Sequence, residues 1–159
     1  MPAPSTSSPV DYELVLTRLI DAPRDKLFRC WSEPALILKW FTPQPWKTVA
    51  TELDLRAGGA SVITMQGPDG TRMPNRGIYL EVVPNERLVF TDAYTSAWVP
   101  SAKTFMTGIL TFEDEGGKTC YTARVRHWSA EDCAAHEKMG FHQGWGVATD
   151  QLAALATAL

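Results

Sequence analysis

The sequence predicts a single α+β domain in which a curved antiparallel sheet of seven strands grips a long C-terminal helix. Short runs rich in β-branched and aromatic residues alternate with tight turn sequences, a pattern typical of antiparallel strands. Two short helical patterns follow the first strand. The C-terminal segment carries an apolar stripe at helical spacing, and such a stripe needs a sheet face to pack against.

Length and composition favour one folded domain. The chain has 159 residues, of which 45% are hydrophobic, 10% aromatic and 21% charged, a balance far from that of chains that stay disordered. Residues 1–10 are rich in proline, serine and threonine without periodicity, so we expect a disordered tail there. The single domain then spans residues 11–159.

The first elements are a strand and two short helices. Residues 12–20 are rich in Leu, Val, Ile and Thr and predict a strand. Residues 23–31 show a one-sided helical pattern that begins with a proline. A second short helix is expected to begin at Pro34 and to stop before Pro43.

Six more strands follow, separated by turn sequences. Glycine pairs, Gly-Pro-Asp-Gly and Pro-Asn-Glu mark the turns, and connections this short join antiparallel neighbours. The expected strands are residues 49–56, 60–66, 76–83, 87–94, 104–113 and 118–127. The connection at residues 94–103 is longer than a hairpin needs and carries Trp98. It is either a flap at the mouth of a pocket or an ordinary surface loop.

The last segment predicts the long helix. Ser129 and Asp132 resemble a capping box at its start. The stripe that should dock on the sheet consists of Phe141, Trp145, Ala148, Leu152, Leu155 and Leu159. Gly140, Gly144 and Gly146 lie inside this pattern, and we expect them to kink the helix or to leave a void.

Several local sequences together resemble one known superfamily. They are Arg18-Leu-Ile-Asp-Ala-Pro-Arg24, Trp31-Ser-Glu-Pro34, Lys39-Trp40-Phe41, Asp54-Leu-Arg-Ala-Gly-Gly59, Gly77-Ile-Tyr-Leu-Glu-Val-Val-Pro84, Glu86-Arg-Leu88 and Met139-Gly-Phe-His-Gln-Gly-Trp145. With the element order, they resemble the START/Bet v 1-like (SRPBCC) superfamily and its Hsp90-activator (Aha1) C-terminal-like, or AHSA1-like, branch. The resemblance implies the helix-grip fold around a cavity that different members use for lipids, hormones, polyketides or proteins. It also implies lipid binding and a link to the stress response.

Charge and hydropathy argue against several classes of function. The net charge is −3 and no long basic run is present, so nucleic acid is not an expected partner. No leader pattern and no apolar stretch of membrane-spanning length occur, so we expect no membrane span. The three cysteines, Cys30, Cys120 and Cys133, are an odd and widely spaced set, which favours the reducing cytoplasm.

Catalytic and metal-binding motifs are weak. The pair His136-Glu137 lacks a second histidine four residues later, because Gly140 stands there. Cys133, His136 and Glu137 could share a helix face, but a solvated first turn is the simpler interpretation. No nucleophile elbow, P-loop or dinucleotide fingerprint occurs. We therefore expect no metal, no cofactor and no catalytic residue.

His127 is the most interesting of the three histidines. Period two places it on the apolar face of the last strand, where it could act as a general base or a polar anchor. The simpler interpretation, which we favour, is a half-exposed ring at the end of the strand. Arg18, Glu52, Asp54, Arg56, Glu81, Arg124 and Arg126 are expected to be cross-strand partners on the solvated sheet face, without chemistry.

Aromatic and methionine side chains are abundant enough to line an apolar pocket. The candidates are Trp40, Met65, Tyr79, Phe90, Trp98, Met106, His127, Phe141 and Trp145. A sheet packed on a helix also needs a large core, so some of these side chains could simply fill it.

Three functions stay open from the sequence. The first is non-enzymatic binding of a small lipophilic molecule between the sheet and the C-terminal helix, with His127 or Tyr79 as polar anchor. The second is an interaction module like the Hsp90 co-chaperone domain, with a chaperone or another protein as partner. The third is a cofactor-independent enzyme like polyketide cyclases or dehydratases, in which His127, His136 or His142 moves a proton.

Overall fold

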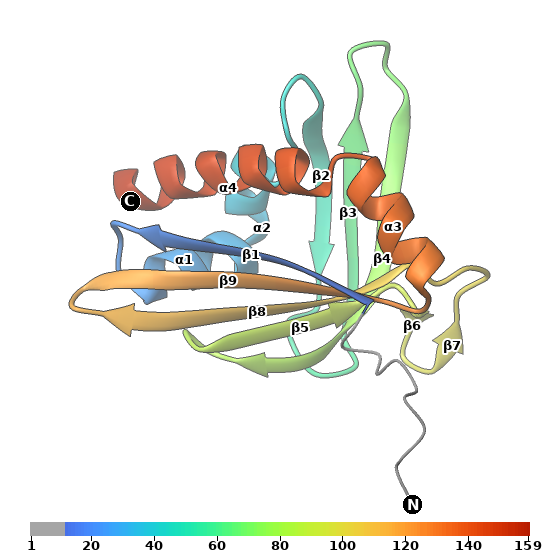
Figure 1. The fold of residues 1–159 in the computed structure, drawn as a ribbon, viewed down its shortest axis with the longest axis horizontal. Coiled ribbons are helices and arrows are strands. Elements are labelled where there is room, and N and C mark those ends of the chain that lie inside the picture. Colours follow the sequence, from blue (N-terminus) through green and yellow to red (C-terminus); the bar gives the residue numbers. More distant parts are fainter. Residues whose placement is uncertain (1–11) are drawn as a thin grey trace, which may run out of the picture.

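The computed structural model describes residues 12–159, and the tail expected at residues 1–10 lies outside this part (Figure 1). The order of elements is that of the helix-grip fold, with two short helices after the first strand and helices at the C-terminus. The elements are β1 (Glu13–Ile20), α1 (Arg24–Ser32), α2 (Pro34–Trp40), β2 (Lys47–Leu53), β3 (Ala60–Gln66), β4 (Arg72–Val83), β5 (Arg87–Thr91), β6 (Tyr94–Ser96), β7 (Val99–Pro100), β8 (Met106–Glu115), β9 (Lys118–His127), α3 (Ala130–Lys138) and α4 (Phe141–Ala158).

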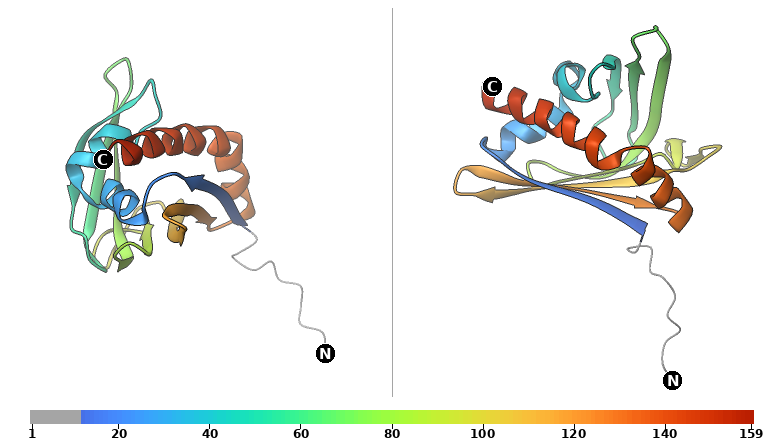
Figure 2. Two further views of the ribbon diagram at one scale, coloured as in Figure 1. Left: turned by 90° about the vertical axis from the view of Figure 1, so that its left-hand side faces the viewer. Right: turned by 45° about the horizontal axis from the view of Figure 1, so that its top comes forward.

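Seven strands form one antiparallel sheet in the order β1-β9-β8-β5-β4-β3-β2. The first strand therefore pairs with the last, and the meander of β2 to β5 continues through β8 to join them. Figure 2 shows this sheet curving around α4, which lies across its concave side. The predicted α+β class, the seven-stranded curved antiparallel sheet and the long C-terminal helix are confirmed.

Two bulges help the sheet to bend. The register shifts between Thr48 and Ala50 in β2, and between Tyr79 and Glu81 in β4. An extra residue on one strand of a pair kinks the strand and increases its twist. On β8, Gly108 makes room for the ring of Phe90, which occupies the space where a side chain on residue 108 would lie.

Two predicted segments differ from the structure. Residues 94–100 form a small hairpin of β6 and β7, where the sequence pattern predicted part of a strand and a loop. The C-terminal helical pattern is divided at Gly140, which has a φ of 97° and ends one helix where the next begins. This left-handed conformation favours glycine. The expected kink is therefore a full break between α3 and α4.

The core lies between the sheet, α1 and the C-terminal half of α4. Leu88, Leu110 and Leu152 are fully buried, and Phe112 and Tyr121 are 1% exposed. Burial of such side chains supplies most of the driving force for folding. Within residues 12–159, no helix is both long and apolar enough to cross a membrane.

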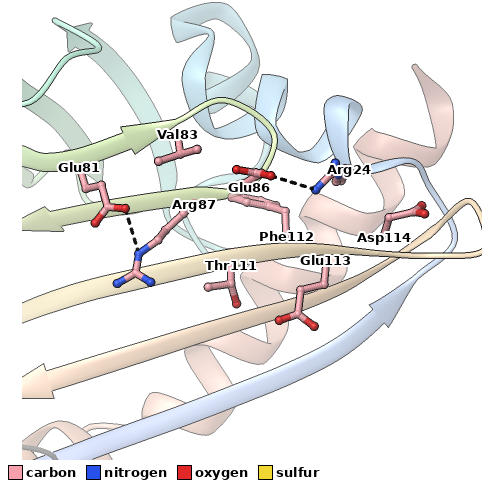
Figure 3. A pocket seen from close by; sticks show the side chains of 9 residues that line it. All are labelled: Arg24, Glu81, Val83, Glu86, Arg87, Thr111, Phe112, Glu113 and Asp114. Atoms are coloured by element: carbon pink, nitrogen blue, oxygen red, sulfur yellow. Dashed lines mark ion pairs between the residues drawn. The ribbon is translucent and has the colours of Figure 1, made fainter.

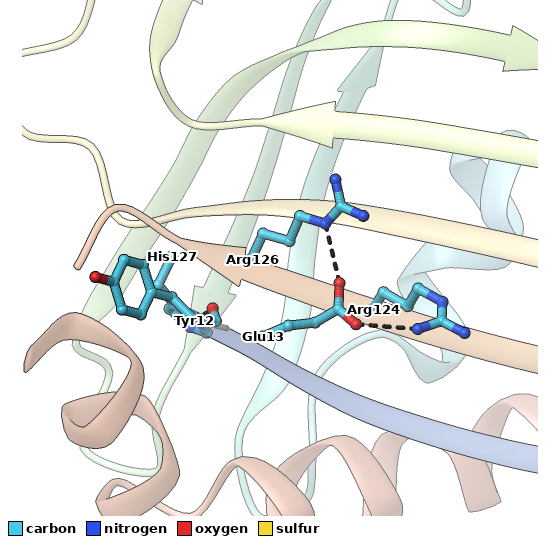
Figure 4. A network of polar contacts seen from close by, with 5 residues as sticks. All are labelled: Tyr12, Glu13, Arg124, Arg126 and His127. Carbon is cyan, nitrogen blue, oxygen red and sulfur yellow. Dashed lines mark hydrogen bonds and ion pairs between the residues drawn. The ribbon is translucent and has the colours of Figure 1, made fainter. Parts of the chain in front are cut away.

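Cross-strand pairing is confirmed for Glu81, which pairs with Arg87, and for Arg124 and Arg126, but not for Asp54 and Arg56, which pair with each other after β2 ends. Arg124 Nη1 and Arg126 Nε donate to the carboxylate of Glu13 at 3.0 and 2.9 Å across the β1–β9 pair (Figure 4). The expectation for Arg18 is wrong, because its guanidinium donates to Asp150 on α4. Residue 18 has the inward parity of β1, so its long side chain reaches the helix that covers this face.

Candidate ligand-binding cavity

A cavity of about 720 Å³ lies between the sheet and the N-terminal half of α4. Side chains from α1, α2, β3, β4, β5, α3 and α4 line it, and residues 101–106 border it near the β6–β7 hairpin. This volume lies within the range of about 300 to 1,000 Å³ that is usual for small-molecule sites. The cavity therefore has room for a ligand of moderate size.

Most of the candidate residues line this cavity. The structure brings them together from six different elements, namely α2, β3, β4, β5, β8 and α4. They are Trp40, Met65, Tyr79, Phe90, Met106, Phe141 and Trp145. Their contribution to binding stays a prediction.

An aromatic cluster forms the wall beside α1 and α2. The ring of Trp31 makes edge-to-face contacts with Trp40 and Phe41, at centroid distances of 4.8 and 5.8 Å. It also stacks on Phe90 at 5.9 Å. The indole N–H of Trp40 donates to the carbonyl oxygen of Cys30 at 2.9 Å, which fixes that ring. Rigid aromatic walls such as this one hold the shape of an apolar site.

Gly144 keeps the opposite wall open. It lines the cavity from the first turns of α4, and a Cβ atom added there would meet no heavy atom within 4 Å. A glycine in a helix interior costs about 1 kcal/mol relative to alanine. The void that the helical glycines were expected to leave is therefore part of the cavity at this position.

Two tyrosines, Tyr79 and Tyr121, line the cavity. Burial raises the pKa of Tyr79 to about 12, and burial also raises the pKa of Tyr121. Both hydroxyls are therefore neutral near pH 7 and can donate or accept a hydrogen bond. The indole N–H of Trp31 approaches the Tyr121 hydroxyl without the alignment of a full hydrogen bond.

A pair of histidines lies where β9, α3 and the cavity meet. His127 is 3% exposed, so the interpretation as a half-exposed strand end is wrong. Its Nε2 atom lies 2.8 Å from Nδ1 of His136 on α3, and its Nδ1 atom lies 2.9 Å from the carbonyl oxygen of Tyr12. His136 lines the cavity, whereas His127 lies behind it.

Acid is expected to destabilise the fold through His136. Burial, and then the neighbouring His127, lower the pKa of His136 from 6.5 to about 4. Between these values the unfolded chain binds more protons than the folded one. The free energy of unfolding should therefore be undiminished above about pH 6.5 and fall as the pH drops toward 4. Because His136 is only partly buried, solvent screening limits the loss to about 1–2 kcal/mol.

Urea unfolding at several pH values between 7 and 4 would measure this loss. His136→Phe should reduce the pH dependence, and His142→Ala, whose side chain is 61% exposed, should leave it unchanged. If His136→Phe and the wild type lost stability equally as the pH falls, the loss could not be assigned to His136.

Trp98 lies away from the cavity. Its side chain is 71% exposed, and its ring contacts Tyr94 at a centroid distance of 6.0 Å. The residue has a φ of 65°, which is unusual for a bulky side chain and is imposed by the β6–β7 turn. The neighbouring Thr95 and Lys103 do line the cavity. The flap function of this segment stays a prediction, without Trp98 as a lining residue.

The described part of the chain, residues 12–159, contains no cluster of side chains suited to hold a metal ion, because no three His, Cys, Asp or Glu side chains come close enough together. Glu137 faces His142 at 3.6 Å. A hollow of about 420 Å³ on another part of the surface is lined by charged side chains, including the ion pairs of Arg24 with Glu86 and Arg87 with Glu81 (Figure 3).

Sequence reasoning missed three features of this site. Trp31 and Phe41 line the cavity although only their neighbour Trp40 was a candidate. His136 was considered only as a metal ligand or a proton carrier, and its contact with His127 was not foreseen. The helical pattern of residues 23–31 was the available signal for Trp31, whereas nothing local in the sequence signals the histidine contact.

Comparisons with known proteins agree with this architecture. The model of the family described as Activator of Hsp90 ATPase homolog 1-like protein matches residues 21–157. A crystal structure of a protein from Nitrosomonas europaea is 36% identical, with a TM-score of 0.89 and coverage of 92% of this chain and 94% of that one. None of the curated proteins compared matches the chain.

Two further solved structures share the fold. A protein from Mycobacterium smegmatis is 26% identical, with a TM-score of 0.77 and coverage of 93% of this chain and 92% of that one. An AHSA1-like protein from Aeromonas hydrophila is 18% identical, with a TM-score of 0.72 and 92% coverage of both chains. At this identity, the second similarity concerns the fold alone.

Proposed function

We propose that this chain, which belongs to the Activator of Hsp90 ATPase homolog 1-like family, binds a small and largely apolar molecule beneath the N-terminal half of α4. The observation that carries the proposal is the cavity of about 720 Å³ with its rigid aromatic wall. A location in the cytoplasm is part of the proposal, because the three cysteines are free thiols, as is usual in a reducing compartment.

The energetics of such binding favour a ligand with one polar group. Burial of about 300 Å² of apolar ligand surface contributes about 7 kcal/mol. Association costs at least about 4 kcal/mol of translational and rotational freedom. Apolar contact alone therefore gives weak binding, and a correctly placed hydrogen bond should decide which apolar molecules bind well.

A titration followed by two-dimensional NMR tests the proposal. The probes are pools of medium-chain alcohols, phenols, fatty acids and sterols, added to isotope-labelled protein. The indole signals of Trp40 and Trp145, which line the cavity, should shift, and that of Trp128, which is 53% exposed, should not. If no pool shifts the cavity signals, the binding proposal is wrong.

Filling part of the cavity at Gly144 should weaken binding without harming the fold. Gly144→Leu places an apolar side chain in open space, so we expect affinity for the best probe to fall at least about tenfold. Gly146→Ala is the matched control, because it relieves the same helix penalty of about 1 kcal/mol outside the cavity, where the nearest atom is Arg18 Nη2 at 4.0 Å. Isothermal titration and urea unfolding of both variants would measure affinity and stability. Equal affinity in Gly144→Leu and the wild type would contradict the assigned site.

A co-chaperone-like interaction is the second candidate, and the family match supports it. In that case an Hsp90-type chaperone added to labelled protein should shift backbone signals of exposed residues. The indole signals of Trp40 and Trp145 should then stay in place. The same spectra therefore distinguish a ligand in the cavity from a protein on the surface.

A further inference from the structure

Hydrogen-bond geometry fixes the positions of the protons in the histidine pair. The Tyr12 carbonyl oxygen, 2.9 Å from Nδ1 of His127, can only accept a hydrogen bond (Figure 4 shows both residues). Nδ1 of His127 must therefore carry a hydrogen. In a neutral imidazole the other nitrogen then has a lone pair, so Nε2 of His127 is an acceptor.

The same reasoning extends to His136. Its Nδ1 atom lies 2.8 Å from the acceptor Nε2 of His127, so Nδ1 of His136 must donate. Nε2 of His136 is then left with a lone pair. The Tyr12 carbonyl, just before β1, thus determines, through His127, the tautomer of a ring that lines the cavity.

Among residues 12–159, no group forms a hydrogen bond with Nε2 of His136. The partly buried ring contacts two aromatic neighbours, with centroid distances of 4.9 Å to Phe105 and 5.2 Å to Phe141. A ligand that displaces solvent from this acceptor loses a hydrogen bond unless it supplies a donor of its own, so a ligand with a donor is favoured over one without.

We propose that the ligand carries a hydroxyl group, alcoholic or phenolic, which donates its hydrogen to Nε2 of His136 while the apolar remainder fills the cavity. This inference rests on the proposed function and names its ligand class. His127 is a positioning residue, because it holds His136 in the accepting tautomer and does not line the cavity.

A carboxylate fits this position poorly. Its oxygens only accept, so they would face the lone pair of Nε2 unless His136 became a cation. Burial and the neighbouring His127 lower the pKa of His136 to about 4, which makes the cation a minor form at pH 7, by a factor of about a thousand. Cationic side chains that line the cavity elsewhere are Arg76 and Lys103. An anionic head group should therefore bind toward these residues.

Three matched probes separate these possibilities: 1-decanol, its methyl ether, and decanoate. The ether keeps the chain and the oxygen but lacks the donor. We expect wild-type protein to bind the alcohol about tenfold more tightly than the ether, as one hydrogen bond of about 1.4 kcal/mol allows. In His136→Phe this preference should disappear, and in Lys103→Gln it should remain. Decanoate should lose affinity in Lys103→Gln and not in His136→Phe.

Nitrogen-15 NMR of the imidazole rings gives a test that needs no variant. In the free wild-type protein, Nδ1 of His136 should be the protonated nitrogen and Nε2 the unprotonated one. Addition of 1-decanol should shift Nε2 upfield as it accepts a hydrogen bond. In His127→Phe the free protein should show a mixture of His136 tautomers, which a purely structural role of His127 would not produce.

The outcomes distinguish this inference from the proposed function. If all three probes bind in the cavity but the wild type does not prefer the alcohol, the inference is wrong and the proposed function stands. A preference retained in His136→Phe, or a protonated Nε2 in the free protein, would also overturn the inference. If none of the probes binds, both fail.

Discussion

Replacing Gly59 by alanine is expected to lower the free energy of unfolding by at least about 3 kcal/mol. A Cβ atom at this position would lie 1.9 Å from the carbonyl oxygen of Asp54 and 3.0 Å from that of Arg56. Both are backbone atoms, so no side-chain rotation can relieve the overlap. The turn between β2 and β3 would have to open. Urea unfolding followed by circular dichroism would measure the loss.

Gly70→Ala provides the comparison. Gly70 has a φ of 87° in an exposed turn, and a Cβ atom there would meet nothing within 4 Å. Only the left-handed backbone would penalise the side chain, by about 1–2 kcal/mol. If Gly59→Ala and Gly70→Ala lowered the free energy of unfolding equally, the overlap with backbone atoms at residue 59 would not be the cause of the loss.

The turn at Gly58 and Gly59 also supports the cavity. Gly58 N–H donates to the carbonyl oxygen of Tyr79 at 2.7 Å, and Tyr79 N–H donates to that of Gly59 at 3.0 Å. These two bonds attach the turn to β4 next to its bulge and hold Tyr79 where its ring lines the cavity. A displaced turn should therefore disturb the cavity wall together with the fold.

The sequence predicted the sheet well because the signals that define it are local. Alternation with period two marks one face of each strand, and turn residues mark where strands end. The pattern of residues 118–127 matches β9 at both ends. Parity also placed His127 on the inner face, and this residue is 3% exposed.

Features that depend on distant parts of the chain were beyond this reasoning. The hydrogen bond between His136 and His127 depends on how α3 packs against β9, which no local pattern encodes. The position of Trp98 depends on a tight turn with a positive φ, so an aromatic side chain on a loop gave no guide to its direction. Arg18 was assigned to the solvated face on its charge, although its parity pointed inward.

The two halves of α4 have different roles. Phe141, Gly144 and Trp145 line the cavity, whereas Leu152 and Ala156 are fully buried in the core. The same apolar stripe therefore lines the cavity in the first half of α4 and packs into the core in the second half. Mutations in the two halves should separate ligand affinity from stability.

Leu152→Ala is expected to lower the free energy of unfolding by about 2–5 kcal/mol while leaving ligand affinity nearly unchanged. Leu152 is 0% exposed and belongs to the cluster of Leu88, Leu110 and Phe112, so its removal leaves a void that rigid neighbours cannot fill. It does not line the cavity.

The partly buried Leu155 on the same helix is the control, and Leu155→Ala should cost clearly less, because part of its surface already faces water. Urea unfolding would measure stability, and titration with 1-decanol at a temperature where every variant is folded would measure affinity. A large loss of affinity in Leu152→Ala, beyond that explained by unfolded protein, would mean that core and cavity are energetically one unit. If Leu152→Ala left the affinity unchanged while Gly144→Leu lowered it, the ligand would lie under the first turns of α4.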